Sequence, residues 1–257
     1  MPACVNISIT KYTLLTDKLV FALGDKSYIQ IMRKLFHWPL DPAGRLVRLA
    51  LAEKQLETEA CISAPWKPNE EVKRLMGDVV GPVLLDQGQH GRVVANHTHA
   101  IIEFLEEIYT DKPKLLPPLA PERAEVRRLW RWLENRFDSE INGSILAERI
   151  AQAVQRASSP DSAALRRGAH ALRGVLTYLN AICEQQNYLV GRQLTLADLV
   201  AAAHLSALDY FGDVPWDSVP DLREWYVRMK SRPCFRGILA DRLTGKQPVA
   251  HYADLDF

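Results

Sequence analysis

The sequence predicts two structural domains, a small α/β domain followed by a larger all-α domain. Three observations support this fold class. Strand-like and helical segments alternate over residues 32–111, four prolines fall within residues 112–121, and the long segments after them have helical periodicity. The chain of 257 residues is 47% hydrophobic and 25% charged, as ordinary globular domains are, which excludes disordered and collagen-like proteins.

The segments of the small domain follow one another as strand, helix, strand, hairpin and helix. Residues 32–38 form a strand-like run, and residues 39–54 have the apolar spacing of an amphipathic helix. Residues 56–62 alternate as a strand, two further strands flank a turn at Gly88, and residues 98–109 are helical. A strand–helix–strand unit pairs its strands in parallel and a hairpin pairs them antiparallel, so we expect a mixed sheet.

The larger domain contains four expected helices. Two long helices cover residues 122–157 and 162–186, and the segment 158–161 between them supplies a proline stop and a new N-cap. A third helix begins at Thr195, and a fourth covers residues 221–231.

Thr195 and Asp198 have the T-x-x-D spacing of a capping box. In that arrangement each side chain bonds a free backbone amide of the other residue at the helix start. The segment that follows, LVAAAHLSAL, is apolar nearly all round, so this helix belongs in the core. We therefore interpret both residues as a structural cap and not as catalytic groups.

Charge excludes some classes of partner. Thirty-two basic and 31 acidic residues leave a net charge of +1, which gives no global field to attract nucleic acid or an anionic membrane. No apolar run approaches the ~20 residues of a membrane span. We expect no nucleic-acid partner and no membrane span.

Cysteines and histidines do not suggest a metal site. Cys4, Cys61, Cys183 and Cys234 form no CxxC pair, and scattered cysteines are typical of reduced thiols in a cytosolic protein. The start of the chain also lacks the pattern of a signal peptide. The H-x-H pair at 97 and 99 directs its side chains about 200° apart on a helix, and no acid cluster accompanies it. We therefore expect no bound metal.

Residues 1–31 lack the periodicity of the rest and end just before Met32. Two explanations remain open, an upstream start codon chosen in error and a real extension with weak structure. We assign this segment no function.

The order of elements from Met32 to about residue 239 resembles the glutathione S-transferase superfamily. Three stretches carry the resemblance: residues 39–54, GPVLLD with ANHTHAIIEFLEE, and YLVGRQLTLADLVAAAHL followed by PDLREWYVRMKSRPCFR. The resemblance implies a thioredoxin-like domain over 32–111, a linker over 112–121, an all-α domain over 122–245 and a tail over 246–257.

The residues at the implied glutathione site depart from the family pattern. Members of the family carry Ser, Tyr or Cys at the start of the first helix, where it activates the glutathione thiol, but Asp41 stands there. A carboxylate would repel a thiolate, and its simpler role is to cap the helix behind Pro42. The family proline aligns with Pro82, for which the resemblance implies a cis peptide. The family's Glu-Ser or Gln-Ser pair is replaced by His97 and Thr98.

Two tryptophans and the tail are candidate partner contacts. Trp38 ends the first strand and Trp66 lies in a loop between two prolines, where either one is an interface anchor or a core residue. In the tail, the sequence pattern places Tyr252, Leu255 and Phe257 on one side and Asp254 and Asp256 on the other. This tail either binds a partner or docks on its own domain.

The resemblance leaves two functions open. The altered site favours a non-catalytic member without a cofactor, because function depends on the site and not on the fold. Within the superfamily the chain is most similar to bacterial division regulators that bind FtsZ filaments as dimers and lack normal glutathione binding. This similarity implies a cytoplasmic protein at the division site that forms a two-fold dimer, with the first two long helices of one chain against the small domain of the other. A further division protein is a candidate partner of the tail. The alternative is a glutathione transferase that acts on small electrophiles.

Overall fold

The computed structural model describes residues 32–88, 90–155 and 159–255. These described residues form one compact unit. The two explanations offered for residues 1–31 concern a segment outside these ranges, as do Asp256 and Phe257 of the tail.

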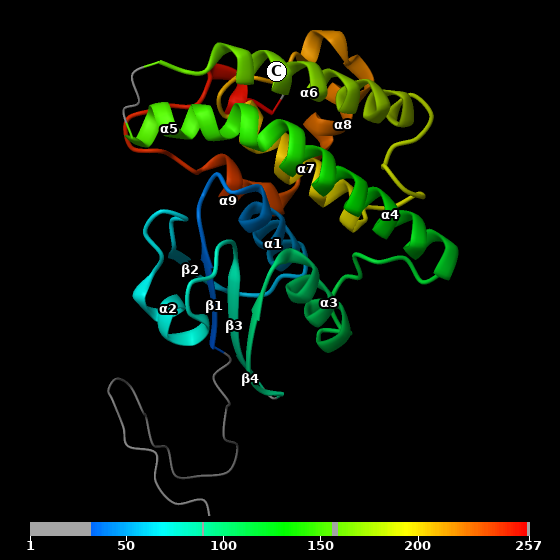
Figure 1. Cartoon of the computed structure of the whole chain (residues 1–257). Coiled ribbons are helices and arrows are strands. Elements are labelled where there is room, and N and C mark those ends of the chain that lie inside the picture. Colours follow the sequence, from blue (N-terminus) through cyan, green and yellow to red (C-terminus); the bar gives the residue numbers. More distant parts are fainter. Residues whose placement is uncertain (1–31, 89, 156–158, 256–257) are drawn as a thin grey trace, which may run out of the picture. The chain divides into compact units, whose positions relative to one another are not determined.

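A four-stranded mixed sheet forms the centre of the first domain (Figure 1). The strands are β1 (Met32–His37), β2 (Glu59–Ile62), β3 (Val83–Gly88) and β4 (Gly91–Asn96), in the order β2-β1-β3-β4. β1 pairs with β2 in parallel, while β1–β3 and β3–β4 are antiparallel. The predicted mixed sheet is confirmed.

Helices cover both faces of this sheet. Leu35 and Leu84 point to the face packed by α1 (Pro42–Glu53) and α3 (Thr98–Ile108). Their chain neighbours Phe36, Val83 and Leu85 point the other way, into a smaller cluster with α2 (Glu70–Met76). Adjacent residues of a strand face opposite sides, so one strand supplies both cores. The sequence analysis missed α2, although the Asn69 side chain caps it by accepting a hydrogen bond from the Glu71 amide.

The first long helix of the second domain has three parts. α4 (Ala120–Arg136) continues into a π-helical segment, η1 (Phe137–Leu146), and then into α5 (Ala147–Gln155). The prediction of one regular helix over 122–157 was therefore wrong in its middle. Turns with i→i+5 hydrogen bonds are rare and occur frequently at functional sites.

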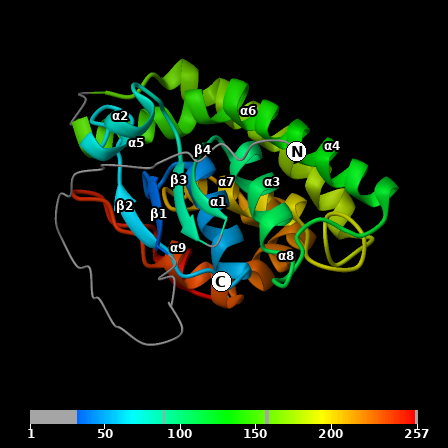
Figure 2. The ribbon, with the colours of Figure 1, turned by 90° about the horizontal axis from the view of Figure 1, so that it is seen from below.

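The remaining helices pack around a buried one. α6 (Ser162–Cys183) lies alongside η1 and α4, and α7 (Leu196–Asp209) is buried along its whole length (Figures 1 and 2). α8 (Pro220–Lys230) follows, with short turns η2 (Trp216–Ser218), η3 (Pro233–Phe235), α9 (Arg236–Leu239) and η4 (Ala250–Ala253). Among the described helices, none has the length and apolarity to cross a membrane.

The capping box at the start of α7 is present. The Asp198 carboxylate accepts hydrogen bonds from the Thr195 amide at 2.9 Å and from its hydroxyl at 3.1 Å. It also accepts bonds from the Leu189 amide at 2.8 Å and the Trp225 indole at 3.0 Å. Asp198 thus joins the cap of α7 to the preceding loop and to α8.

In the described part of the tail, Tyr252 is buried and Leu255 is 41% exposed, so these two apolar residues do not share one side as the sequence pattern predicts. Tyr252 is fully buried, with its hydroxyl donating to the Ile238 carbonyl and its ring against Tyr210. Lys230 donates to the backbone carbonyls of His251 and Asp254. The tail docks on its own domain at least as far as Asp254, because Tyr252 is buried within the fold and Lys230 binds the Asp254 carbonyl.

Candidate functional site

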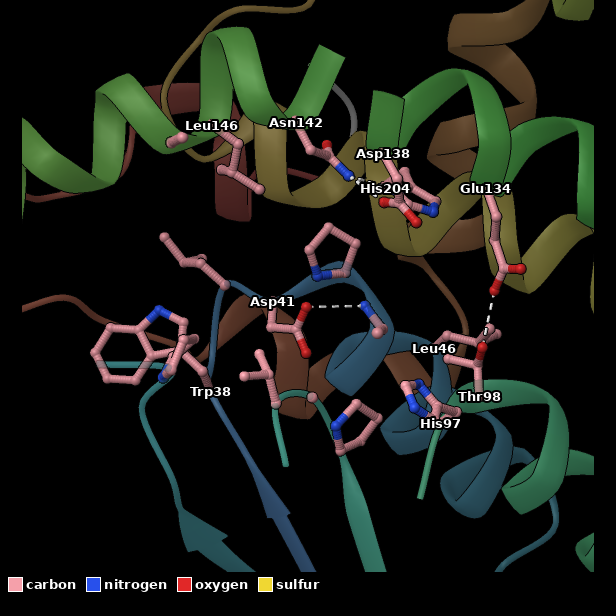
Figure 3. Close-up of a pocket in the computed structure, with 18 of the residues that line it drawn as sticks. Trp38, Asp41, Leu46, His97, Thr98, Glu134, Asp138, Asn142, Leu146 and His204 are labelled. Atoms are coloured by element: carbon pink, nitrogen blue, oxygen red, sulfur yellow. Dashed lines mark hydrogen bonds between the residues drawn. The ribbon is translucent and has the colours of Figure 1, made fainter. Parts of the chain in front are cut away.

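A cleft of about 710 Å³ lies between the amino ends of α1 and α3 on one side and η1 with α7 on the other (Figure 3). Trp38, Leu40, Leu46, Leu146 and Ile150 give it apolar walls. Its polar side chains come from both domains: Asp41, His97, Thr98, His99, Arg131, Glu134, Asp138, Asn142 and His204.

Asp41 is the N-cap of α1. Its carboxylate accepts hydrogen bonds from the amides of Ala43 at 3.3 Å and Gly44 at 2.9 Å. Burial raises the pKa of Asp41 to about 6, although the two amides oppose this rise. The predicted cap is confirmed, and the group directed into the cleft at this helix start is a carboxylate.

The predicted cis peptide before Pro82 is wrong. The described residues contain no cis peptide bond, so the Gly81–Pro82 bond is trans, and Gly81 has φ of +101°. Pro82 is buried where β3 begins and lines the cleft.

Thr98 and His99 are bound to a carboxylate of the helical domain. The Thr98 hydroxyl donates to Glu134 at 2.8 Å, and His99 Nε2 lies 2.7 Å from the other oxygen of Glu134. Burial opposes ionisation of Glu134, but these hydrogen bonds hold its pKa below the usual value. The Thr98 hydroxyl is therefore already engaged, while His97, in the left-handed region with φ of +65°, makes no capping hydrogen bond.

The helical domain contributes a polar chain that the sequence analysis missed. The Asn142 amide donates to Asp138 at 3.0 Å and to His204 Nδ1 at 3.3 Å. Because the amide nitrogen can only donate, His204 Nδ1 accepts and the ring proton lies on Nε2. Burial lowers the pKa of His204 to about 4 and raises the pKa of Asp138. In the sequence, His204 is a lone histidine in an apolar helix, which only weakly indicates that it hydrogen-bonds a residue of another helix.

The two tryptophans singled out from the sequence lie together at the edge of the cleft. Their rings meet edge to face, with centroids 4.9 Å apart, and Trp66 is 45% exposed. The structure thus brings Trp38, Trp66, Asp41, Pro82, His97 and Thr98 into one site. Tyr252, Asp254 and Leu255 do not line this cleft.

Over the ranges that the structure describes, no three histidine, cysteine or acidic side chains are grouped to hold a metal ion. What the cleft offers instead is a cap carboxylate, an Asp–Asn–His chain, the Glu134 acceptor and an apolar wall. These groups can donate and accept hydrogen bonds, and among the cleft residues named here no thiol or free hydroxyl stands at the start of α1.

The comparisons with known proteins agree with this architecture. Residues 35–113 match the family model for the glutathione S-transferase N-terminal domain, and residues 149–233 match that for the C-terminal domain. The FtsZ-localized protein A of Caulobacter vibrioides (strain NA1000 / CB15N) is 46% identical over 229 residues, which are 89% of this chain and 100% of that protein.

Solved structures give the same result. FzlA from C. crescentus superposes with a TM-score of 0.83 at 46% identity, covering 88% of this chain and 100% of that one. A glutathione S-transferase from Rhodospirillum rubrum F11 superposes with a TM-score of 0.82 at 41% identity and the same coverage. With both domains matched and full-length relatives at this identity, the chain belongs to the glutathione S-transferase superfamily.

Proposed function

We propose that this chain is a non-catalytic glutathione S-transferase-fold protein that binds FtsZ filaments and regulates bacterial cell division. The similarity to FtsZ-localized protein A, which spans that protein's full length at 46% identity, supports the partner. The chemistry of the cleft supports the absence of catalysis.

The observation that carries the proposal is Asp41. Family members place a hydroxyl or thiol at the start of the first helix, where it stabilises the thiolate of glutathione. Here both carboxylate oxygens accept amide hydrogen bonds from α1. A thiolate beside Asp41 would meet a carboxylate in a low-dielectric site, which raises the pKa of the thiol and disfavours catalysis.

The second anchor of glutathione is also altered. In the family an acid or amide precedes the serine that binds the γ-glutamyl carboxylate. His97 supplies no negative charge for the γ-glutamyl ammonium group, and the Thr98 hydroxyl is bound to Glu134. We infer that glutathione binds weakly or not at all.

The proposal includes a two-fold dimer in the cytoplasm at the division site. Exposed apolar side chains support an interface, among them Trp66 at 45% and Val80 at 63% exposure beside the cleft, and Tyr178 at 38% on α6. Light scattering at micromolar concentration is expected to give twice the mass of one chain. A monomer mass at that concentration would refute this part of the proposal.

One pair of measurements tests the function. Co-sedimentation with FtsZ polymer is expected to carry the protein into the pellet, whereas unpolymerised FtsZ leaves it in the supernatant. Calorimetric titration with glutathione is expected to show no saturable heat, and no transfer to 1-chloro-2,4-dinitrobenzene above background is expected. Absence from the FtsZ pellet contradicts the binding function.

A glutathione transferase is the second candidate. The open cleft of about 710 Å³ and the 41% identity to a glutathione S-transferase from R. rubrum favour it. In that case backbone amides alone would activate the thiol. Saturable transfer activity that is lost on blocking the cleft, for example with Ala43→Trp, would establish this candidate and contradict the non-catalytic proposal.

We also propose that the tail contacts a further division protein through its last residues only. Tyr252 is unsuited to that role because it is fully buried. Leu255 remains 41% exposed and Asp254 is exposed, so a partner would have to read the end of the chain from Asp254 onward.

A further inference from the structure

A second hollow lies on the helical domain, between η1 and α6. It measures about 920 Å³ and is separate from the glutathione-site cleft. α6 runs alongside the long helix that contains η1 (Figure 1). The π-helical segment contributes to both hollows, with Asp138 and Asn142 lining the cleft and Ser139 and Glu140 lining this groove.

The groove is strongly basic. Arg166, Arg167 and Arg173 of α6 and Arg136 of α4 line it, together with His170. Positions 166, 170 and 173 recur at i, i+4 and i+7, which places them on one face of the helix.

Carboxylates compensate this charge only in part. Among the described residues, Glu140 is the single acid that lines the groove, and it pairs with Arg136 at 2.7 Å. Asp161 lies within Coulombic range of Arg166 and Arg167, but its carboxylate caps α6 by accepting from the amides of Ala163 and Ala164. Within the described ranges, Arg166, Arg167 and Arg173 have no ion pair, and all three are exposed.

Arg136 has an unused donor in this groove. Its Nη1 binds Glu140, while its buried Nε has no hydrogen-bond partner within the described part of the chain. Nη2, on the same edge as Nε, faces Gly174, where an added Cβ would lie 3.9 Å away. A buried donor without a partner destabilises the fold. Because Nε is buried, the exposed cations of the groove are Arg166, Arg167 and Arg173.

We propose that the groove between η1 and α6 is a docking site for an acidic peptide segment of a protein partner. The step from Arg166 to Arg173 covers roughly 10 Å along the helix axis, which an extended peptide spans in about three residues. Three or four consecutive or alternating Asp and Glu residues therefore match the row of cations. Binding to a nucleic acid normally uses a longer row of some 6–10 phosphate contacts, and the whole chain carries a net charge of only +1.

The groove is unsuited to pair with its own copy. A two-fold contact brings identical surfaces together, so a dimer formed through this groove would bring two sets of unpaired arginines against each other. The groove extends along α6 from Arg166 to Thr177 and takes only Arg136 from α4, which leaves the rest of α4 and the last turn of α6 for the proposed dimer. The inference stands apart from the proposed function, since peptide binding is measured without FtsZ.

Fluorescence anisotropy of the full chain with a labelled hexaglutamate peptide tests the proposal. We expect saturable binding at low salt that weakens steeply as salt is added. Replacing Arg166, Arg167 and Arg173 together by Gln is expected to raise the Kd at least tenfold. The matched control replaces Arg92, Arg192 and Arg236, which are exposed outside the groove, and should change the Kd less than twofold.

Three further measurements make the result decisive. Lysine at the same three groove positions keeps the charge and is expected to retain at least a third of the affinity; a loss as large as with Gln overturns charge recognition. Equal losses in the groove and control variants, tighter binding of a single-stranded oligonucleotide through the same arginines, or no peptide binding also overturn it. If light scattering gives the Gln variant a different oligomer mass from the unaltered chain, the groove is a contact between copies of this chain, which overturns peptide docking.

Discussion

At the residue scale, the Asp198 side chain connects three segments of the fold by hydrogen bonds. The capping box predicts one bond to the Thr195 amide, but the carboxylate accepts four hydrogen bonds, including those from Leu189 and Trp225. Because Asp198 is fully buried, removing it leaves donors without partners in the core.

We therefore expect Asp198→Ala to lower the free energy of unfolding by about 3–5 kcal/mol. Thr195→Ala removes the hydroxyl and the γ-methyl group and should cost about 0.5–2 kcal/mol. Urea unfolding followed by circular dichroism measures both. Equal, small losses in the two variants would show that the extra bonds of Asp198 do not stabilise the fold.

His204 makes stability depend on pH. Its pKa is about 4 in the folded chain against 6.5 when exposed, so the folded state binds fewer protons in this interval. The contribution of neutral His204 to the free energy of unfolding is fully present above pH 6.5 and is lost as the pH falls toward 4. His37, with a pKa also lowered to about 4 by burial, acts with the same sign. Burial raises the pKa of Asp41 from 3.8 to about 6, so this group lowers the free energy of unfolding as the pH rises through that interval.

His204→Gln keeps an acceptor for Asn142 and removes the titration. Between pH 7 and pH 4 we expect wild type to lose about 2–3 kcal/mol more of unfolding free energy than the variant. Chemical denaturation at half-unit pH steps gives the free energy of unfolding of both proteins as a function of pH. Subtracting one curve from the other removes the pH dependence that His37 and Asp41 contribute to both. Parallel curves would contradict the assignment of a buried, neutral His204.

At the scale of elements, α6 and η1 pack at very short range. A Cβ added to Gly168 would lie 2.6 Å from Ile145 Cγ1 and 2.9 Å from Ser144 Cβ. Gly174 lies six residues further along the same helix, and among the described residues a Cβ added there would meet only Arg136 Nη2, at 3.9 Å.

These two glycines form a matched pair. Gly168→Ala is expected to destabilise the fold by about 1–3 kcal/mol, because the helices must move apart. Gly174→Ala should stabilise it by about 0.5–1 kcal/mol, the usual gain of alanine over glycine within a helix. Thermal unfolding of both variants tests the contact, and a stabilising Gly168→Ala would contradict it.

At the scale of the whole molecule, the tail connects elements from both domains. His251 Nε2 lies 2.9 Å from the buried Asp209 of α7, and the Val249 amide donates to the Tyr210 carbonyl. Tyr252 lies beneath the guanidinium of Arg45, whose carbon is 6.0 Å from the ring centre. Arg45 belongs to α1 and also donates to Ser206 of α7 at 2.8 Å.

Deleting residues 251–257 should therefore lower the melting temperature by several degrees, because it empties the Tyr252 site and uncovers Lys230. Deleting 255–257 keeps the docked part and is expected to leave the melting temperature unchanged. Calorimetry of the two truncations separates docking from any role of the terminal residues. An unchanged melting temperature in the longer deletion would show that the tail does not stabilise the domain.

Local features of the fold follow from the amino-acid sequence alone. The spacing of apolar residues predicts the strands and hairpin, the acid before Pro42 predicts the cap of α1, and the T-x-x-D motif predicts the cap of α7. Each of these depends on residues within a few positions of one another. The α2 helix was missed although its local signals, the Asn69 cap and the glycine after Met76, were present. The domain boundaries and the role of residues 1–31 remain predictions.

The tertiary structure decided the features that depend on distant partners. Asn142 and His204 meet across 62 positions. Tyr252 is buried against Arg45 of α1, Tyr210 at the end of α7 and Ile238 of α9. The π-helical turns of η1 and the basic groove are likewise decided where two helices pack. Periodicity shows which face of a helix is apolar, but not which side chain from elsewhere will meet it, since that choice follows from packing in three dimensions.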